Sequence, residues 1–339
     1  MHQAADRVLK RKEKTMKKRV RKITAMLLAV SMVLGVSGCG KSQKSTQDSG
    51  DTAKVKIAYQ YGLAYAPLTI MQEQGLIEKN YDGDIEVEWV SLNSGSAINE
   101  GMASGDIDVA CMGIAPFITG VTAGIPYKMY GTIAAQPNEL LTNEDSIHSL
   151  KDITDDTKIS VVNVGSIQHI LLAKQELGDA HALDNNLVTM SHPDGMTALM
   201  SGSVACPLTP APYIFKAKEQ DNIKEAESLD SVWPEGNAFI VGLVSDDLYE
   251  NQPEIYQAVV DATQEAMDYI NNNQEEAANI LCKKEDVTAE TMQEWLQDPG
   301  CVYDMKLPGV MDMANFMAEN DFVDSAPESF EAITTESAR

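Results

Sequence analysis

The chain has 339 residues and a formal net charge of −25, with 26 Lys and Arg against 51 Asp and Glu. This acidic balance argues against nucleic-acid binding, which depends on basic side chains that neutralise phosphates. Apolar residues make up 44%, too many for a disordered chain, and the length favours two domains that each bury a core.

The first 38 residues have the layout of a secretory signal peptide. Basic residues at 17–22 precede an apolar stretch at 23–36, and the small residues Ser37 and Gly38 then lead to Cys39. The apolar stretch is shorter than the roughly 20 residues that span a bilayer. Met16 is an alternative start, in which case residues 1–15 are not translated.

Two interpretations of Cys39 are open. The Val36-Ser37-Gly38-Cys39 ending resembles a bacterial lipobox, in which Cys39 is lipidated and becomes the mature N-terminus; the alternative is an ordinary signal peptide with an accidental cysteine. A lipid holds a protein at a membrane without spanning it, and the polar residues 39–53 predict a flexible tether. We therefore expect a lipid-anchored protein outside the cytoplasmic membrane, on the bacterial surface or the periplasmic side.

The chain lacks the usual signatures of catalysis and metal binding. Its other cysteines, Cys111, Cys206, Cys282 and Cys301, form no CxxC pair, and its five histidines show no ligand spacing. No nucleotide-binding or hydrolase motif occurs either. We expect no metal, no cofactor and no enzymatic activity, whereas a disulfide between Cys282 and Cys301 is left open.

Strands and helices alternate from residue 54 onward. Strands are expected at 55–59, 85–90 and 107–112, with helices at 64–74 and 94–102 between them. This order predicts a sheet with helices on its faces.

The same plan recurs farther along the chain. Strands are expected at 158–162, 188–190 and 204–208, and helices at 166–178 and 196–200. The repeat indicates a second unit built like the first, although any chain that alternates strands and helices shows this rhythm.

The last part of the chain is mostly helical. An apolar run at 238–244 suits a central strand. Helices are expected at 253–281 with a break near 271–273, at 289–297 after the capping residue Thr288, and from Pro308 to Asn320.

This order of elements predicts two lobes joined by two chain crossings. Lobe I comprises residues 54–135 plus 237–339, and lobe II comprises residues 136–236. Each lobe is an α/β unit with a mixed sheet flanked by helices. The two crossings form a two-strand hinge.

The loops after the strands predict a ligand-binding cleft, because ligands of open sheets bind at the carboxyl ends of strands. Glycines there let a ligand approach the backbone, and serines at helix starts can hold an anionic or carbonyl group. The predicted site residues are Gln60, Tyr61, Gly62, Ser94, Gly95, Ser96, Gly113, Ile114, Ser166, His169, Thr209 and Tyr213. For each serine the alternative is plain helix capping, and for each aromatic residue it is core packing.

Several stretches carry a family resemblance: 61–68, 74–79, 94–97, 102–110, 113–116 and 123–126, together with Gly165, Ser166 and His169. They resemble the substrate-binding lipoproteins of ABC importers in the nitrate/sulfonate/bicarbonate (taurine-type) group, which share a domain with binders of thiamine-pyrimidine precursors. The resemblance implies the two-lobed periplasmic-binding-protein-like fold of type II. It also implies a small-molecule solute and, as partners, an ABC permease and its ATPase. We expect a monomer.

The resemblance implies a small organic or oxyanion solute, such as nitrate, a sulfonate or a pyrimidine vitamin precursor. Similar anion binders place a basic side chain in the cleft, and here Lys128 is the nearest candidate, outside the strand-end loops. This favours a neutral or aromatic-bearing solute. The alternatives are an enzyme that resembles makers of the thiamine pyrimidine, which have a cysteine-rich stretch that this chain lacks, and a sensor or adhesin.

Overall fold

The computed structural model describes residues 52–175 and 177–339, and Gly50–Arg339 forms one compact unit. The predicted signal peptide, Cys39 and nearly all of the predicted tether lie outside the described residues. Within the described part, no helix is both long enough and apolar enough to cross a membrane.

The first of two sheets contains five strands in the order β2 (Ile85–Ser91), β1 (Ala53–Tyr59), β3 (Val109–Gly113), β10 (Ile240–Ser245) and β4 (Tyr127–Ala134). β1 runs parallel to β2 and β3, whereas β10 is antiparallel to β3 and β4. β3 and β10 lie in the interior and are almost entirely buried, which explains their continuous apolar sequences.

The second sheet also contains five strands, in the order β7 (Leu187–Thr189), β6 (Ile159–Val161), β8 (Cys206–Pro210), β5 (Asn138–Thr142) and β9 (Lys224–Ser228). β6 is parallel to β7 and β8, and β5 is antiparallel to β8 and β9. Both sheets are therefore mixed, as expected, and the second repeats the strand arrangement of the first.

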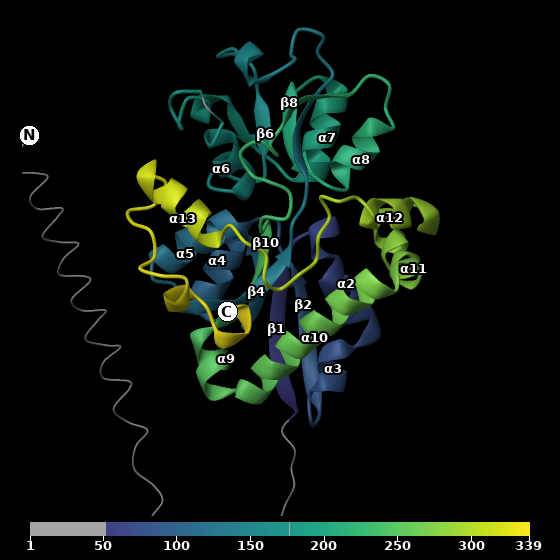
Figure 1. Cartoon of the computed structure of the whole chain (residues 1–339), viewed down its shortest axis with the longest axis vertical. Coiled ribbons are helices and arrows are strands. Elements are labelled where there is room, and N and C mark those ends of the chain that lie inside the picture. The colour runs from purple at the N-terminus through teal and green to yellow at the C-terminus, as the bar shows by residue number, and fades with distance from the viewer. Residues whose placement is uncertain (1–51, 176) are drawn as a thin grey trace, which may run out of the picture. The chain divides into compact units, whose positions relative to one another are not determined.

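The helices lie against the faces of the sheets (Figure 1). The α-helices are α2 (Ala66–Gln74), α3 (Leu76–Asn80), α4 (Gly95–Ser104), α5 (Ile114–Thr122), α6 (Ile167–Ala173), α7 (His192–Ser201), α8 (Tyr213–Lys218), α9 (Asp246–Asn251), α10 (Pro253–Asn272), α11 (Gln274–Glu285), α12 (Ala289–Leu296) and α13 (Val310–Glu319). Short 3₁₀ turns are η1 (Leu63–Tyr65), η2 (Leu150–Asp152), η3 (Asp184–Asn186), η4 (Glu331–Ile333) and η5 (Glu336–Ala338). α10 packs on α2 and α3, while α4 packs on α5.

Local chemistry explains where several helices begin and end. The hydroxyls of Ser94, Ser166 and Thr288 accept hydrogen bonds from backbone N–H groups at the starts of α4, α6 and α12. Gly75 ends α2 in the left-handed conformation, with φ of 59°. The predicted break near 271–273 is confirmed at Asn273, which separates α10 from α11.

Other boundaries differ from the predictions. The helix expected from 166 to 178 ends at Ala173, where the chain turns through a Gln175 N–H bond to the Leu172 carbonyl. The helix expected at 196–200 begins earlier, at His192, because Ser191 caps it and Pro193 fits its first turn. The helices α3, α5, α8 and α9 and the strands β4, β5 and β9 were not predicted individually.

Two chain segments pass from one sheet to the other. Residues 135–137 connect β4 to β5, and residues 229–239 connect β9 to β10. β4 and β10 are neighbours in the first sheet, and β5 and β9 are neighbours in the second. The lobe boundaries and the action of these segments as a hinge stay predictions.

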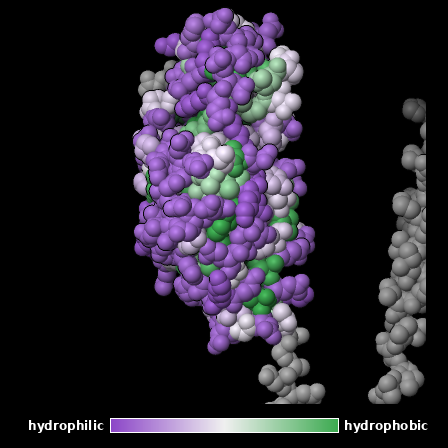
Figure 2. All heavy atoms as spheres, turned by 90° about the vertical axis from the view of Figure 1, so that its right-hand side faces the viewer, coloured by the Kyte–Doolittle hydropathy of each residue, from purple (hydrophilic) through white to green (hydrophobic). Residues whose placement is uncertain are grey.

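Polar side chains cover much of the surface (Figure 2). The face shown in Figure 2 is mostly hydrophilic, with smaller apolar areas between the polar side chains. Among large apolar side chains, Tyr61, Val164 and Met200 are the ones that stand out as exposed in the described part of the chain. Tyr61 follows β1 and Val164 follows β6, so both lie in strand-end loops of the kind that the predicted cleft uses.

Candidate functional site

A cavity of about 40 Å³ lies where strand-end loops of the two sheets meet. Six predicted site residues line it: Gln60, Tyr61, Gly62, Gly95, Gly113 and Ser166. The first five belong to the first sheet's side, and Ser166 starts α6 on the second sheet's side. The volume leaves room for a few water molecules only, so an organic solute requires the two sides to separate.

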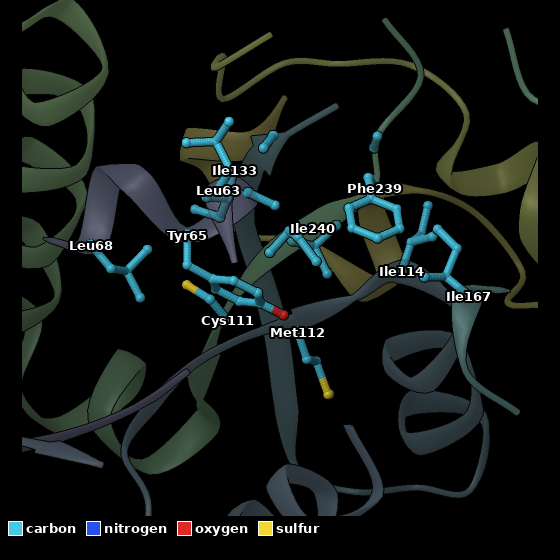
Figure 3. Close-up of a cluster of buried hydrophobic side chains, with 14 of the residues drawn as sticks. Leu63, Tyr65, Leu68, Cys111, Met112, Ile114, Ile133, Ile167, Phe239 and Ile240 are labelled. Atoms are coloured by element: carbon cyan, nitrogen blue, oxygen red, sulfur yellow. The ribbon is translucent and has the colours of Figure 1, made fainter. Parts of the chain in front are cut away.

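The two sides of the cavity come into contact at Gly113 and Gly62. A Cβ atom added at Gly113 would lie 3.6 Å from the Cβ of Ile167, and one added at Gly62 would lie 3.8 Å from the Ala211 carbonyl oxygen. In Figure 3, Ile167 lies beside Ile114 at the edge of the apolar cluster. The first residues of α6 therefore rest directly on the carboxyl end of β3.

Tyr65 orients the amide of Gln60 beside the cavity. Its hydroxyl donates a hydrogen bond of 3.1 Å to Gln60 Oε1, and both residues line the cavity. Burial raises the pKa of Tyr65 well above its ordinary value, so the hydroxyl stays protonated and remains a donor. The Gln60 NH₂ group is left as a hydrogen-bond donor for a solute.

The hydroxyls of Ser94 and Ser96 are used locally and do not line the cavity. Ser94 Oγ accepts from the N–H of Ala97 and lies 2.9 Å from Ser96 Oγ. Gly95 lies between them and lines the cavity in their place. Ile114 is fully buried in the apolar cluster behind the cavity (Figure 3). The roles predicted for these residues stay predictions.

His169 lies behind the cavity wall with both ring nitrogens occupied. Its Nδ1 accepts from the N–H of Gly165 at 2.9 Å, and its Nε2 lies 2.9 Å from Asp184 Oδ1. Phe322, from the segment after α13, packs edge-on against the ring at 5.3 Å. The neighbouring residue Gln168 lines the cavity, whereas His169 does not.

His181 joins this cluster to the C-terminal segment. Its Nδ1 lies 2.9 Å from Asp184 Oδ2, and its Nε2 lies 2.9 Å from the Asn320 carbonyl oxygen. Both partners are acceptors, so the geometry fits a ring that donates from both nitrogens. The hydrogen bonds to Asp184 and to the Asn320 carbonyl accordingly raise the pKa of His181.

Two side chains of α8 make a second contact between the second sheet's side and the first sheet's side. Lys216 Nζ donates to Glu285 Oε2 at 2.8 Å, and Phe215 stacks on Trp295 with ring centroids 5.7 Å apart. α8 follows β8 of the second sheet, whereas Glu285 ends α11 and Trp295 belongs to α12. These contacts join α8 to α11 and α12.

The lining also contains polar residues that the sequence analysis did not place in the site, among them Asn163 and His192. Asn163 Nδ2 donates to the Val164 carbonyl, while its buried Oδ1 has no hydrogen-bond partner in the described part of the chain. A solute with an N–H or O–H group can satisfy that oxygen. Asn163 follows β6 directly, so the rule that placed the other strand-end loops in the site could have found it.

The cavity carries no charged side chain at neutral pH. Its lining contains no Lys, Arg, Asp or Glu, and desolvation lowers the pKa of His192 to about 4. Lys128, the nearest basic candidate in the sequence, does not line the cavity; its Nζ lies 3.8 Å from Asp246 Oδ1 and 5.3 Å from the centre of the Tyr249 ring. An anion would have to rely on hydrogen bonds and helix N-termini, without a cationic side chain.

The cysteines of the described part of the chain are unpaired. The free thiols are Cys111, Cys206, Cys282 and Cys301. The disulfide that the sequence left open between Cys282 and Cys301 is therefore not formed in the structure. Within the described residues, no group of three His, Cys, Asp or Glu side chains is placed to hold a metal ion.

Solved structures share this fold along most of the chain. The periplasmic aliphatic sulphonate-binding protein SsuA of Escherichia coli is 20% identical with a TM-score of 0.63, over 83% of this chain and 92% of that one. The nitrate-binding protein NrtA of Synechocystis is 16% identical with a TM-score of 0.62, over 85% and 84%. A Candida albicans protein described as having the generic periplasmic binding protein fold is 16% identical with a TM-score of 0.67, over 84% and 96%.

The sequence comparison agrees with this fold. The model of the NMT1-like family matches residues 48–283, and no curated protein matches the chain. The resemblance to substrate-binding proteins of the nitrate and sulfonate group is thereby confirmed, as is the two-lobed periplasmic-binding-protein-like fold.

Proposed function

This chain belongs to the NMT1-like family, and from that premise we propose that it is the extracytoplasmic solute-binding lipoprotein of an ABC importer. The observation that carries the proposal is the cavity enclosed by strand-end loops of both sheets. A site of this kind binds a solute by enclosing it and requires no reacting group.

The proposed mechanism is closure about the two connecting segments, 135–137 and 229–239. With the sides apart, a solute reaches Gly95 and Gly113 on one side and Ser166 on the other. Contacts to both sides then favour a form that closes around the solute, with the sides farther apart than in the arrangement with the 40 Å³ cavity, because a ligand shifts an equilibrium by its difference in affinity for the two states. A permease would accept the solute from the closed protein when the sides separate again.

The chemistry of the lining supports a small uncharged solute ahead of nitrate or a sulfonate. A buried anion without a cationic partner has to be stabilised by hydrogen bonds and helix N-termini, whereas a neutral solute has no such requirement. The Gln60 amide offers donors and Asn163 Oδ1 offers an unpaired acceptor. A neutral pyrimidine with amino and ring-nitrogen groups fits both.

The proposed location follows from the N-terminal sequence. A lipid on Cys39 would anchor the protein outside the cytoplasmic membrane, and residues 39–53 would tether the folded part to it. At about 15 residues, a flexible tether reaches on the order of 20 Å, enough for the folded part to meet a permease in the same membrane.

A thermal-shift screen tests the proposal. The panel contains nitrate, taurine and other sulfonates, pyrimidines and vitamin precursors. A solute at one hundred times its Kd stabilises the protein by about 2.7 kcal/mol, which raises the Tm by several degrees. We expect a neutral solute to give the largest rise.

The variant Ser166→Trp fills the cavity and should abolish the rise for every hit, because Ser166 is 4% exposed and lines the cavity. Ser203→Trp, at an exposed position after α7, is the control and should respond like the wild type. A rise that persists in Ser166→Trp would place the site elsewhere.

A further inference from the structure

His192 is held in the cavity wall by neighbouring side chains. It is the first residue of α7, which Ser191 caps, and it lines the cavity. The ring of Tyr213 packs against it with centroids 5.5 Å apart and planes 33° apart. Thr209 Oγ1 lies 3.1 Å from His192 Nδ1. The sequence analysis predicted Thr209 and Tyr213 as site residues but not His192. In the structure both of them contact His192.

The contact with Thr209 selects one tautomer of the ring. Thr209 is 1% exposed, and within residues 52–175 and 177–339 its hydroxyl has no hydrogen-bond partner other than His192 Nδ1. If Nδ1 carried the proton, the buried hydroxyl would have no acceptor, which is costly. The hydroxyl therefore donates to Nδ1, and the proton of the neutral ring lies on Nε2.

The surroundings also keep the ring neutral. Desolvation lowers the pKa of His192 to about 4, and the N-terminal end of α7 disfavours a positive charge beside it. Above about pH 5 the ring is an uncharged donor. Within the described part of the chain, Nε2 has no hydrogen-bond partner of its own.

We propose that His192 is a specificity-determining residue, whose Nε2–H donates a hydrogen bond to an acceptor atom of the solute. This inference rests on the proposed function and refines it. The solute must present a carbonyl, sulfonate or nitrate oxygen or a ring nitrogen to this side of the cavity. A solute that presents an ammonium or another cationic donor there is rejected, because two donors would face each other.

The tautomer is measured without any solute by NMR of protein labelled with ¹⁵N-histidine. We expect a neutral Nε2–H ring whose nitrogen signals stay constant between pH 5 and pH 8. Thr209→Val should give a mixture of tautomers, because the donor to Nδ1 is lost, while Thr209→Ser should preserve the wild-type spectrum. A ring protonated on Nδ1, or one that titrates near pH 6.5, would overturn the inference.

Binding variants test the contact itself. The probes are nitrate, taurine and a neutral 4-aminopyrimidine, with Kd measured by calorimetry. His192→Leu should weaken the probe that binds best by about tenfold or more, since its acceptor is left unsatisfied. His192→Gln keeps an N–H donor at a similar distance and should stay within about threefold of the wild type.

The outcomes separate the two claims. If a probe binds the wild type and His192→Leu equally, the inference is wrong and the proposed function stands. If no probe binds the wild type, the proposed function fails and the inference fails with it. Whether the pyrimidine or an anion is the probe that loses affinity tells which kind of acceptor His192 contacts.

Discussion

Oxidation of the double variant Gly113→Cys/Ile167→Cys is expected to abolish solute binding, and reduction is expected to restore it. Gly113 ends β3 on one side of the cavity, and Ile167 begins α6 on the other. A Cβ at position 113 would lie 3.6 Å from the Cβ of Ile167, within the range of about 3.5–4.5 Å that disulfides require. The bond would hold the two sides together over a cavity too small for an organic solute.

The experiment measures the binding of the best solute from the screen with and without dithiothreitol. The single variants, treated with the same oxidant, control for effects of the native thiols and should bind in both conditions. Equal affinity of the oxidised and reduced double variant, with the cross-link verified by mass spectrometry, would show that solute entry does not need the sides to separate. Failure of the cross-link to form would contradict the contact between β3 and α6.

Gly242→Ala is expected to lower the free energy of unfolding by about 2–3 kcal/mol, because the position has no room for a methyl group. Gly242 lies in β10, and a Cβ there would be 2.4 Å from Cζ of Tyr130. The Tyr130 ring is buried, and its hydroxyl lies 3.3 Å from Thr263 Oγ1 and 3.8 Å from Cys111 Sγ. Because the Tyr130 ring is enclosed in this way, moving it aside would disrupt these contacts.

Urea unfolding of the two single variants and of Gly242→Ala/Tyr130→Leu measures the effect. Removing the ring should relieve the clash, so the double variant is expected to lose less stability than the sum of the single variants. A wild-type midpoint for Gly242→Ala, or strict additivity in the double variant, would contradict the packing of β10 against β4.

The local part of the fold was predictable because its signals are short-range. Ser94, Ser166 and Thr288 start helices by capping an N–H three residues ahead. Gly75 ends a helix by adopting positive φ. Such signals require no knowledge of the rest of the chain.

The site was predictable only at the level of loops. The rule that ligands bind at the carboxyl ends of strands gave Gln60, Gly113 and Ser166, which line the cavity. It could not tell which neighbour in each loop faces inward. The hydroxyl of Ser94 caps its own helix, and His169 is hydrogen-bonded to Asp184, fifteen residues away.

His192 shows why the remainder could not be predicted. In the sequence it is one of five histidines without ligand spacing. Its role depends on Thr209, seventeen residues away on β8, and on Tyr213 at the start of α8. Only the packing of α7 against these elements brings the three side chains together beside the cavity.

The most direct test of the central claim is a crystal structure with the tightest-binding solute of the screen. We predict a solute enclosed between Gly95 and Gly113 on one side and Ser166 on the other, with an acceptor atom within hydrogen-bonding distance of His192 Nε2. A solute that contacts one sheet only, or that lies in the separate groove lined by Met305 and Met311, would contradict it.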